Sequence, residues 1–531
     1  METLRADVAI VGYGPVGRMQ AIVLAEKGHH VVVVDRQKSC YPLPRAVCMD
    51  HEVFRAMHAH GCGGDIGSYS APSPRYQWFG QDWSKLLDID WTIESVSGGP
   101  EAHFFYQPAL EAALETRIKE LGTVKVLTEH EALALTQDKD GVELQLSDRQ
   151  SGTARRVQAR YLVGADGANS MVRKALNIGW KDLGFKADFL VVDLALNEGV
   201  ELDIPPAGQF CNTERPTTFV PGGIKDGRVL RRWEFMLMPH ETKEDFESEE
   251  SVWKLLSRWV KPDQGEFLRH AIYTFRSLVA ERWRDGRVFL AGDSAHLTPP
   301  FLGQGMCSGM RDAINLGWRL DLLLRNAASD ELLQGYEEER KPHITQLIEI
   351  AMYLGKIICV ADPQQAAERD RAFLDGTAPP PPELPYLRQG TVQPDSAVAG
   401  RLSPHADVVA CEGVVRLDDF TGPFFVLVAR SRDALEAMVP RHRDLMQRLN
   451  VKALYLSSGL EASTRGIGDV TGKLGCFLDD HAIDAYLVRP DGYLFGSIPR
   501  GGALTDMLDA LGKSIPPAVF SHGDARLAPA R

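Results

Sequence analysis

The segment from Val8 to Asp35 constrains the fold of this chain more than any other part of the sequence. Val8-Ala-Ile-Val11 is a short apolar run typical of a buried strand, and the glycine-rich stretch Gly12-Tyr-Gly14-Pro-Val-Gly17 follows it. Met19 to Lys27 then has helical periodicity, and a second apolar run, Val31 to Val34, ends at Asp35. Since parallel strands need a crossover connection, usually a helix, this order predicts a βαβ unit of a parallel sheet.

The glycine spacing in this unit fits the GxGxxG fingerprint of dinucleotide-binding folds. Gly12 allows a tight turn, Gly14 lets the backbone approach a pyrophosphate, and Gly17 lets helix and strand pack closely. The helix N-terminus adds N–H donors and the positive end of a dipole. Asp35 lies 23 residues after Gly12, where a carboxylate can bind ribose hydroxyls, so we predict a bound dinucleotide.

Two further acids stand at predicted strand ends. Asp166 follows the apolar run Tyr161 to Gly164, and Asp293 follows Arg287 to Ala291; a helical pattern comes after each. An unpaired carboxylate at a crowded strand end costs solvation unless a donor satisfies it, which favours a binding role. Each acid could instead be a helix N-cap.

The pattern of strands and helices predicts several domains, as expected for 531 residues. Between about 186 and 279, alternating strands are separated by Pro/Gly turns, which suggests a largely antiparallel sheet inserted between two parts of the first domain. The proline run from Ala378 to Pro385 is typical of a stiff linker. The predicted parts are a nucleotide-binding domain at 1–185 and 280–377, the inserted sheet at 186–279, a linker at 378–399 and a small α/β domain at 400–531.

The charge and the cysteine content of the chain limit the partners and cofactors that we expect the protein to bind. The 59 basic and 72 acidic residues give a formal net charge of −13, which repels phosphate backbones and anionic membranes, so we expect neither nucleic acid nor membrane as a partner. The eight cysteines include no CxxC pair and no metal-ligand spacing, so we expect reduced thiols and no metal. Without a charged, apolar leader or a long apolar run, we expect a cytoplasmic protein.

The motifs together resemble a known family. Gly12 to Gly17, Asp166-Gly167 and Gly292-Asp293, in this order, resemble the FAD-dependent aromatic hydroxylases of the p-hydroxybenzoate hydroxylase type, the class A flavoprotein monooxygenases. Pro44-Arg45-Ala46 and Gln107 to Glu111 stand between them as in that family. The resemblance covers the whole chain.

Other motifs resemble particular branches of the family. Arg489-Pro-Asp-Gly-Tyr493 is similar to an element of the thioredoxin-like C-terminal domain in the phenol hydroxylase branch. Asp50-His-Glu52, Arg231 to Met236 and Gly303 to Asp312 are most similar to the 3-(3-hydroxyphenyl)propanoate hydroxylases. The fold class implied is α/β, with a Rossmann-like FAD-binding domain, an inserted, mainly antiparallel substrate-domain sheet and a thioredoxin-like C-terminal domain.

The resemblance also implies roles for individual residues. Asp293 would accept hydrogen bonds from the ribityl chain of FAD, and Pro299 and Pro300 would form a backbone wall beside the isoalloxazine ring. The helix after Gly303 would aim its N–H groups at the pyrimidine edge of the flavin and stabilise negative charge on the reduced ring. The full set of expected cofactor-binding residues is Gly12, Gly14, Pro15, Val16, Gly17, Asp35, Arg36, Arg45, Ala46, Gln107, Asp166, Asp293, Pro300, Gly303, Gln304, Gly305 and Met306.

The reaction implied is hydroxylation of a phenol. NADH or NADPH, bound transiently, would reduce FAD, and O2 captured as a flavin hydroperoxide would supply one oxygen atom to the ring. The expected substrate is 3-(3-hydroxyphenyl)propanoate or a related phenol of aromatic catabolism, hydroxylated at the ortho position. The group that deprotonates the phenol is not identified; Arg231, Arg232 or His240 could meet a substrate carboxylate or phenol, or could have an ordinary surface role.

Alternatives remain open within and outside this class. A resorcinol or polyketide phenol could be the substrate, and the protein could bind flavin without hydroxylating anything; a homodimer is also open. A flavin disulfide reductase is disfavoured because Cys40 and Cys48 are too far apart for a redox pair. A flavin halogenase is disfavoured because no WxWxIP-like run is present.

Overall fold

The computed structural model describes residues 2–39, 42–73, 75–410, 413–436, 438–457 and 465–518. Internal contacts divide the chain into two units, each described here by itself. The first contains residues 1–25, 30–313 and 344–385, and the second contains residues 26–29, 314–343 and 386–531. The long helices α7 and α8 contribute residues to both units.

The first unit contains the predicted parallel sheet. Its strand order is β17-β18-β11-β1-β2-β8, and β18, β11, β1, β2 and β8 run parallel. The bounds are β1 Glu2–Val11, β2 Val31–Val34, β8 Val124–Leu127, β11 Ala154–Gly164, β17 Arg284–Asp285 and β18 Val288–Leu290. A hairpin, β9 (His130–Gln137) with β10 (Val142–Asp148), extends this sheet from β11.

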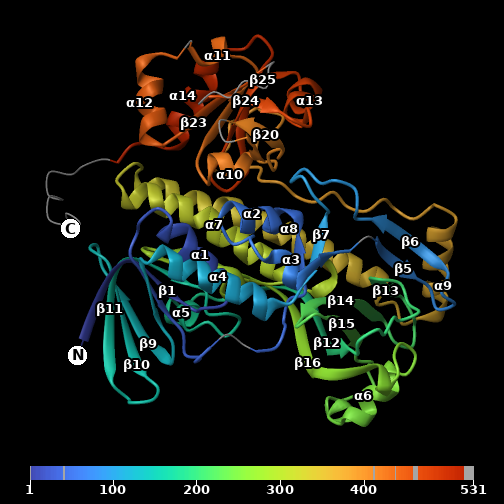
Figure 1. Ribbon diagram of the computed structural model, residues 1–531. Helices are drawn as coiled ribbons and strands as arrows, with labels where there is room; N and C mark the ends of the chain where they lie inside the picture. Colours follow the sequence, from blue (N-terminus) through green and yellow to red (C-terminus); the bar gives the residue numbers. More distant parts are fainter. Residues whose placement is uncertain are drawn as a thin grey trace. The chain divides into compact units, whose positions relative to one another are not determined.

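The helix of the βαβ unit is confirmed, with different bounds. Helix α1 spans Pro15–Ala25, so it begins four residues before the apolar periodicity. Proline is favourable in the first helical turn because its missing N–H has no helical partner there. Helix α1 packs beside α4 (Gln107–Leu121) (Figure 1). The buried Arg18 of α1 and Glu111 of α4 form an ion pair there.

The second sheet of this unit is mainly antiparallel, as predicted. Its order is β19-β16-β12-β15-β14-β13-β5-β6, and only β13 and β5 pair in parallel. The bounds are β5 Arg75–Phe79, β6 Lys85–Asp90, β12 Trp180–Leu196, β13 Gly208–Phe210, β14 Thr217–Lys225, β15 Arg228–Met236, β16 Gly265–Ala280 and β19 His296–Leu297. Strands β5 and β6 precede the predicted insertion, so the sheet recruits residues from outside 186–279.

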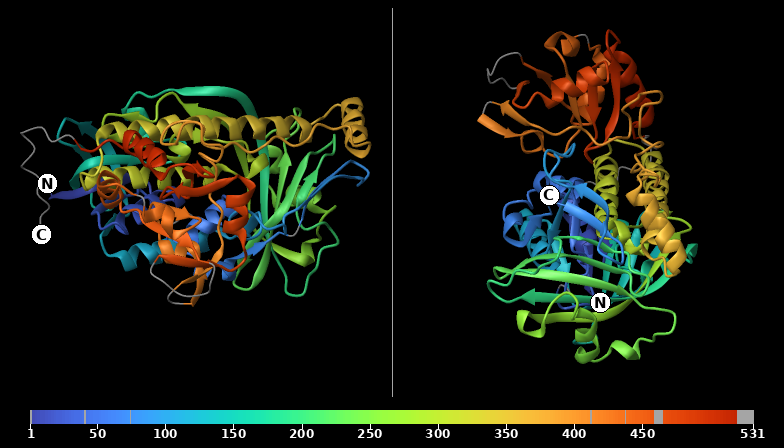
Figure 2. Two further views of the ribbon diagram at one scale, coloured as in Figure 1. Left: turned by 90° about the horizontal axis from the view of Figure 1, so that it is seen from above. Right: turned by 90° about the vertical axis from the view of Figure 1, so that its right-hand side faces the viewer.

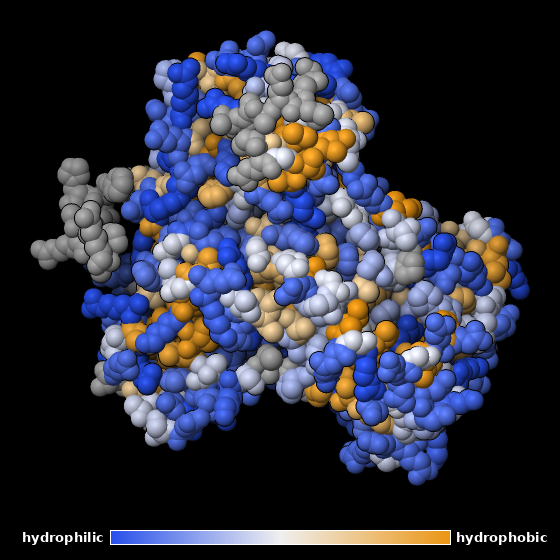
Figure 3. Space-filling model, viewed as in Figure 1, coloured by the Kyte–Doolittle hydropathy of each residue, from blue (hydrophilic) through white to orange (hydrophobic). Residues whose placement is uncertain are grey.

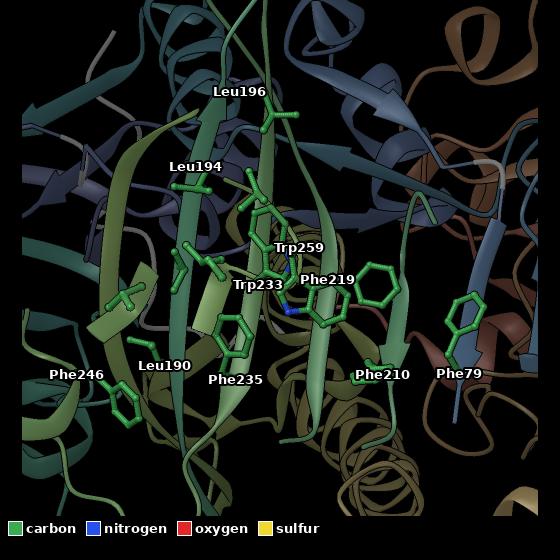
Figure 4. Packing of buried hydrophobic residues seen from close by; sticks show 14 residues of the cluster. Phe79, Leu190, Leu194, Leu196, Phe210, Phe219, Trp233, Phe235, Phe246 and Trp259 are labelled. Carbon is green, nitrogen blue, oxygen red and sulfur yellow. The ribbon is translucent and has the colours of Figure 1, made fainter. Parts of the chain in front are cut away.

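One face of this second sheet forms an aromatic core. Trp233 and Phe235 of β15 pack with Phe219 and Trp259 and with aliphatic residues of β12 (Figure 4). Helix α6 (Glu249–Leu256) contributes Val252 and Leu256 to the same cluster. Because side chains alternate along a strand, Arg232, Glu234 and Met236 lie on the opposite face. We call this opposite face the inner face.

The remaining elements of the first unit connect these sheets. A three-stranded sheet has the order β3-β7-β4. Its bounds, with those of the adjoining helices, are β3 Cys48–Asp50, β4 Ser70–Pro72, β7 Ala102–Phe105, α2 His51–Ala59, α3 Ile66–Tyr69 and α5 Met171–Ala175. Among the short 3-10 helices of this unit are η3 Gly292–Ser294 and η4 Pro300–Leu302, both in the loop after β18.

Three helices follow the loop after β18: α7 (Gly305–Leu324), α8 (Gln334–Ile358) and α9 (Pro363–Leu374). The angle between the helical segment that ends at Ile358 and α9 is 109°. The turn of the chain between them is visible in Figure 2. Within the described residues, no single helix is long and apolar enough to cross a membrane; the bent pair 330–358 and 363–374 passes on length and composition alone. Hydrophobic residues on the face in Figure 3 form separate groups among hydrophilic ones.

The second unit contains a seven-stranded sheet of order β21-β20-β24-β23-β22-β25-β26. Its strands are β20 Asp407–Ala410, β21 Gly413–Arg416, β22 Val426–Ala429, β23 Lys452–Leu456, β24 Gly466–Asp469, β25 Ile483–Val488 and β26 Leu494–Pro499. Strands β22, β23 and β24 are parallel, and β25 and β26 run against them. The helices are α10 Leu417–Thr421, α11 Arg432–Glu436, α12 Pro440–Arg448, α13 Lys473–Asp480 and α14 Leu504–Ser514. The expected fold class, including the thioredoxin-like C-terminal domain, is confirmed.

Candidate functional site

The three predicted acids and the glycine loop meet at one edge of the parallel sheet. Strands β18, β11, β1 and β2 are consecutive neighbours, so their carboxyl ends place Asp293, Asp166, Gly12 and Asp35 side by side. Main-chain hydrogen bonds join these ends: the Gly12 amide donates to the Val34 carbonyl over 2.8 Å, and the Ala165 amide donates to the Val11 carbonyl over 2.7 Å. Ligands of open α/β sheets bind at this edge.

The glycine loop is packed differently at each of its three glycines. A Cβ on Gly12, whose φ is +108°, would lie 2.2 Å from the Ala165 carbonyl oxygen. A Cβ on Gly17 would lie 2.0 Å from the Gly12 carbonyl oxygen. At Gly14 a Cβ would meet no protein atom within 4 Å. Gly12 and Gly17 are therefore required by the fold, whereas Gly14 borders free space, as a cradle for a diphosphate requires.

Asp35 is held against the glycine loop by main-chain donors. Its Oδ2 accepts a hydrogen bond from the Tyr13 amide over 2.7 Å, and its Oδ1 accepts one from the Gln37 amide over 2.7 Å. Each carboxylate oxygen still has a lone pair for a further donor. The neighbouring Arg36 is exposed, and its carbonyl accepts a hydrogen bond from Arg149.

Asp166 and Asp293 have different surroundings. Asp166 accepts hydrogen bonds from the Ser170 hydroxyl and from the amides of Met171 and Val172. Its carboxylate therefore binds the first N–H groups of helix α5. Asp293 accepts no hydrogen bond from the described residues and is exposed, although many protein atoms surround it. This crowding raises the pKa of Asp293, and the positive charges of His296 and Arg45 partly oppose the rise. Because its carboxylate is exposed and accepts no hydrogen bond from the described residues, Asp293 is available to a ligand.

Gln107 fixes the loop that carries Arg45 and Ala46. Its Oε1 accepts hydrogen bonds from the amides of Arg45 and Ala46 over 3.0 and 2.7 Å, and its Nε2 donates to Glu111 over 2.8 Å. The Gln107 side chain is buried, whereas Arg45 is exposed. Gln107 therefore positions the loop, and Arg45 is the accessible group.

The loop between β18 and α7 packs closely on the glycine loop. A Cβ on Gly292 would lie 2.9 Å from Val16, and one on Gly309 would lie 2.6 Å from the same side chain. The buried Asp312 carboxylate accepts hydrogen bonds from the Gly292 amide over 3.0 Å and pairs with His296 over 2.7 Å. Val16 is thus enclosed by two glycines, which fixes α1 against the start of α7.

The first turn of α7 is accessible, unlike the turns that follow. Residues 302–306 are half-buried, whereas 307–313 are buried. The Gln304 carbonyl accepts the first helical hydrogen bond, from Ser308, and a Cβ on Gly305 would meet nothing within 4 Å. Gly303 adopts a φ of +63° beside Cys48. The N–H groups of this turn are therefore open to an acceptor, because the first N–H groups of a helix have no helical partner.

Arg311 fastens this turn to the segment that follows β3. It donates to Glu52 over 2.6 Å, to Gln304 Oε1 over 2.8 Å, and to Asp50. Burial raises the pKa of Asp50, but the charges of Arg311 and His51 outweigh this and lower it to about 2. Two of the three motifs that resemble this branch of the family, Asp50-His-Glu52 and Gly303 to Asp312, are therefore joined by one guanidinium group.

The inner face carries a buried charge cluster. Arg232 pairs with Asp193 over 2.7 Å and Arg269 pairs with the same carboxylate over 2.6 Å. Arg232 also donates to the carbonyls of Pro44 over 2.9 Å and of Arg45 over 2.5 Å. Arg232 therefore has Asp193 as its counter-ion, and its remaining donors hold the Arg45 loop; because Arg232 is 3% exposed, an ordinary surface role is ruled out for it.

The other two residues suggested for the substrate, Arg231 and His240, are not part of this charge cluster. Arg231 is buried on the face that carries Trp233, and it donates to the Pro206 carbonyl over 2.6 Å. Burial alone lowers the pKa of Arg231, to about 10. His240 is exposed beyond the end of β15. Neither residue lies on the inner face.

Comparison with known proteins identifies the family. The model of the FAD binding domain matches residues 5–351, and the model of the HcaD C-terminal domain matches residues 400–513. A probable NADH-specific resorcinol 4-hydroxylase of Rhodococcus jostii is 33% identical over 96% of this chain and 95% of its own. A 3-(3-hydroxy-phenyl)propionate/3-hydroxycinnamic acid hydroxylase of Mycolicibacterium gilvum is 30% identical over 92% of this chain and 88% of its own.

The chain belongs to the FAD-dependent aromatic hydroxylases. Its fold is also that of the flavin-dependent monooxygenase PieE, solved with FAD and substrate, which aligns with a TM-score of 0.80 at 20% identity over 97% of this chain and 99% of PieE. FAD is therefore the cofactor of this hydroxylase. The residues at the sheet edge fit this group: a free cradle at Gly14, a held acid at Asp35, an available acid at Asp293 and an open helix start at Gly305.

Sequence reasoning missed several polar residues of the inner face. Asp193 and Tyr76 on the inner face have no motif around them, and Asp193 is 39 residues from Arg232. Glu234 lies within the motif Arg231 to Met236 but was not singled out as a candidate. A signal was present for Glu234, since the strand Arg232-Trp-Glu-Phe-Met236 alternates charged and aromatic residues. Cys40, which lies too far from Cys48 in the sequence for a redox pair, is outside the described residues, as is Cys411; the described cysteines form no disulfide bond with one another.

Proposed function

We propose that this enzyme hydroxylates a neutral phenolic ring of the resorcinol class, at a position ortho to a hydroxyl group, with NADH as reductant and O2 as oxygen donor. When bound, FAD supplies the redox chemistry: it takes electrons from NADH and activates O2. The protein binds and orients the two reactants and excludes water. A single observation carries the proposal: the inner face of the second sheet lies against both loops expected to flank the flavin.

The contacts of the inner face support this placement. Arg232 holds the Pro44 and Arg45 carbonyls at one end of a row of opposed residue pairs on β12 and β15. At the other end, the ring of Phe189 lies 6.0 Å from that of Phe301, beside Pro300. A ring bound between these ends would lie next to a flavin held by the two loops.

The proposed FAD contacts follow the site geometry. Gly12, Gly14, Pro15, Val16 and Gly17 would border the diphosphate, with Asp35 and Arg36 at the adenosine half. Asp293 would accept from the ribityl chain, and Arg45, Ala46, Pro300 and the turn Gly303 to Met306 would flank the isoalloxazine ring. Gln107 and Asp166 would act indirectly, since their side chains hold the Arg45 loop and helix α5.

The choice of a neutral phenol rests on charge balance. Arg232 and Arg269 face two carboxylates, Asp193 and Glu234, so this cluster offers no excess positive charge to a substrate carboxylate. The 33% identical relative from Rhodococcus jostii, named for resorcinol and NADH, supports the same choice. The 30% identical relative from Mycolicibacterium gilvum keeps 3-(3-hydroxyphenyl)propanoate as the second candidate.

The proposal extends to the organisation of the protein. We also propose domains at 1–185, 186–279, 280–377 and 400–531 with a linker at 378–399, and the cytoplasm, where NADH is available, as the compartment. Homodimer formation is left to a measurement of mass in solution.

The test is NADH oxidation by the purified, FAD-loaded protein with resorcinol, with 3-(3-hydroxyphenyl)propanoate, and with no phenol. We expect resorcinol to accelerate oxidation by at least about tenfold and the product to gain one oxygen atom, read by mass spectrometry with 18O2. Acceleration with only H2O2 as product would mean that the ring binds but is not the substrate. If only the propanoate gained oxygen, the charge argument would be wrong while the hydroxylase assignment stood.

A further inference from the structure

A row of polar side chains crosses the inner face over four neighbouring strands. Gln209 of β13 donates through Nε2 to the Tyr76 hydroxyl oxygen of β5 over 2.6 Å and accepts through Oε1 from the Thr218 hydroxyl of β14 over 2.8 Å. Thr218 is in register with Glu234 of β15. Tyr76, Gln209, Thr218 and Glu234 form what we call the polar row.

The polar row lies between the two groups of residues that connect the sheet to the proposed flavin loops. On one side, Tyr76 packs with Val47 and Cys48, which follow Ala46. On the other side, Tyr76 and Met236 pack in the cluster that contains Phe301 and Phe189. Val191, in register with Glu234, stands between Phe189 and Asp193 on β12. The row therefore faces the space where a ring next to the flavin would lie.

Glu234 is a buried carboxylate whose hydrogen-bonding capacity is unused. The residue is 8% exposed, and its side chain accepts no hydrogen bond from the described residues; the Arg232 guanidinium lies 3.7 Å away. A buried carboxylate without donors is costly, which indicates that a ligand satisfies it.

The charged and titratable groups that act on this carboxylate come from three strands. They are Arg232 on its own strand, Asp193 on β12 and Arg269 on β16. On a fourth strand, β5, the negative charge of Glu234 raises the pKa of Tyr76. Burial raises the pKa of Glu234; Arg232 and Arg269 oppose the rise, and Asp193 adds to it. A carboxylate with a raised pKa is a better proton acceptor for a phenol.

Tyr76 complements Glu234 at the other end of the row. Its ring stacks on Trp91 at 4.8 Å, and its oxygen already accepts the hydrogen bond from Gln209, so its O–H has a proton to donate. Burial raises the pKa of Tyr76, with opposition from the Gln209 hydrogen bond, so the hydroxyl stays protonated at neutral pH. The row thus offers an acceptor at one end and a donor at the other.

We propose that Glu234 accepts the hydrogen bond, and then the proton, of the substrate hydroxyl that activates the ring, while Tyr76 donates to a second oxygen of the same ring. The proton passes from the phenol oxygen to a carboxylate oxygen of Glu234; no other bond changes, and the ring becomes a phenolate. This assignment rests on the proposed function. It also makes Glu234 a determinant of specificity, because its negative charge disfavours a ring that carries a carboxylate.

The test compares Glu234→Gln with the wild type and with Glu266→Gln. Glu266 lies on the same sheet, its side chain is 69% exposed, and it pairs with Arg228, so it receives the same chemical change away from the row. We expect Glu234→Gln to lower kcat/KM for resorcinol by about 100-fold. In the wild type, kcat/KM should fall at acid pH as the Glu234 carboxylate becomes protonated. This fall should be absent in Glu234→Gln, which has no carboxylate at position 234.

A spectroscopic measurement separates this role from a structural one. Ultraviolet difference spectra of the FAD-loaded protein titrated with resorcinol should show the phenolate band in the wild type and in Glu266→Gln, and not in Glu234→Gln. Glu234→Asp should restore the phenolate band and the fall of kcat/KM at acid pH, with a lower kcat than the wild type. This variant keeps the test decisive if Glu234→Gln folds poorly.

Each failure has a distinct meaning. If the wild type hydroxylates resorcinol but Glu234→Gln keeps the same pH profile and phenolate band, the role of Glu234 is overturned and the proposed function stands. A wild type that holds FAD but neither binds nor hydroxylates any phenol overturns both. A wild type that accepts only the carboxylate-bearing phenol, with selectivity unaltered in Glu234→Gln, overturns the specificity argument.

Discussion

Gly14 and Gly17 stand three residues apart and have opposite relations to the protein around them. A side chain at Gly17 would collide with a carbonyl oxygen, and one at Gly14 would point into free space. The sequence motif contains both glycines, but only Gly17 is required by the packing of the protein. Gly14 is required by the ligand that occupies the space beside it.

The pair Gly14→Ala and Gly17→Ala should therefore separate folding from cofactor binding. We expect Gly17→Ala to lower the free energy of unfolding by about 3 kcal/mol, because backbone must shift to relieve the overlap. Gly14→Ala should unfold like the wild type without FAD and bind FAD at least about tenfold more weakly, a loss of about 1.4 kcal/mol. Thermal unfolding of the apoprotein and FAD titration by fluorescence measure the two effects; equal FAD affinity in Gly14→Ala would contradict the proposed diphosphate position.

Single residues were predictable from the sequence where the motif is local. The glycine loop and the acids at the strand ends lie within a few residues of the strands that position them, so Asp35 and Asp293 were placed correctly at the sheet edge. The roles of Gln107 and Arg232 depend on partners 62 and 39 residues away. No pattern along the chain encodes such distances, so their binding to backbone and to Asp193 emerges only from the fold.

At the scale of elements, the junction of α2 with α7 depends on one ion-pair cluster. Asp50 accepts from the Val53 amide over 3.0 Å at the start of α2 and pairs with Arg311 of α7. Secondary structure was predictable here as well, since β2 matches the apolar run Val31 to Val34. The recruitment of β5 and β6 was not, because strand pairing across more than a hundred residues leaves no periodic signal.

The low pKa of Asp50 predicts a pH-dependent stability. Since the folded value, about 2, lies below the unfolded value of 3.8, the ionised carboxylate stabilises the fold above about pH 4. This contribution of about 2 kcal/mol is lost as pH falls toward 2. Asp50→Asn keeps a capping oxygen but has no charge, so its deficit in unfolding free energy should be full at pH 6 and smaller at pH 3. Urea unfolding at both values measures this, and a pH-independent deficit would contradict the assignment.

At the scale of the whole molecule, the second unit depends on a buried charge network. Glu339 of α8 accepts from Arg319 of α7 over 2.6 Å, from Arg489 over 2.7 Å, and from the Thr391 amide over 2.7 Å. Burial raises the pKa of Glu339, but the two arginines outweigh it and lower the value to about 2. The element Arg489-Pro-Asp491, found in the sequence as a family motif, thus joins helical residues 314–343 to the C-terminal sheet within this unit.

Removing the charge of Glu339 should destabilise the second unit. Glu339→Gln leaves two buried guanidinium groups with Asp491 as their remaining carboxylate, and we expect a loss of about 3–5 kcal/mol. The adjacent Glu338 is exposed, so Glu338→Gln is the matched control and should leave the unfolding free energy within about 0.5 kcal/mol of the wild type. Urea unfolding followed by circular dichroism measures both; equal midpoints for the two variants would refute the network's importance.

The alternation along β15 has a consequence for how such an enzyme can change. Trp233 and Phe235 belong to the aromatic core, whereas Arg232, Glu234 and Met236 face the other way, so each successive position serves one task only. Substitutions at Glu234, Thr218 or Gln209 can alter which molecules are accepted without removing a core side chain. New substrate ranges are therefore reachable by single amino-acid steps that leave the scaffold intact, and a mutant library confined to these positions should contain mostly folded members.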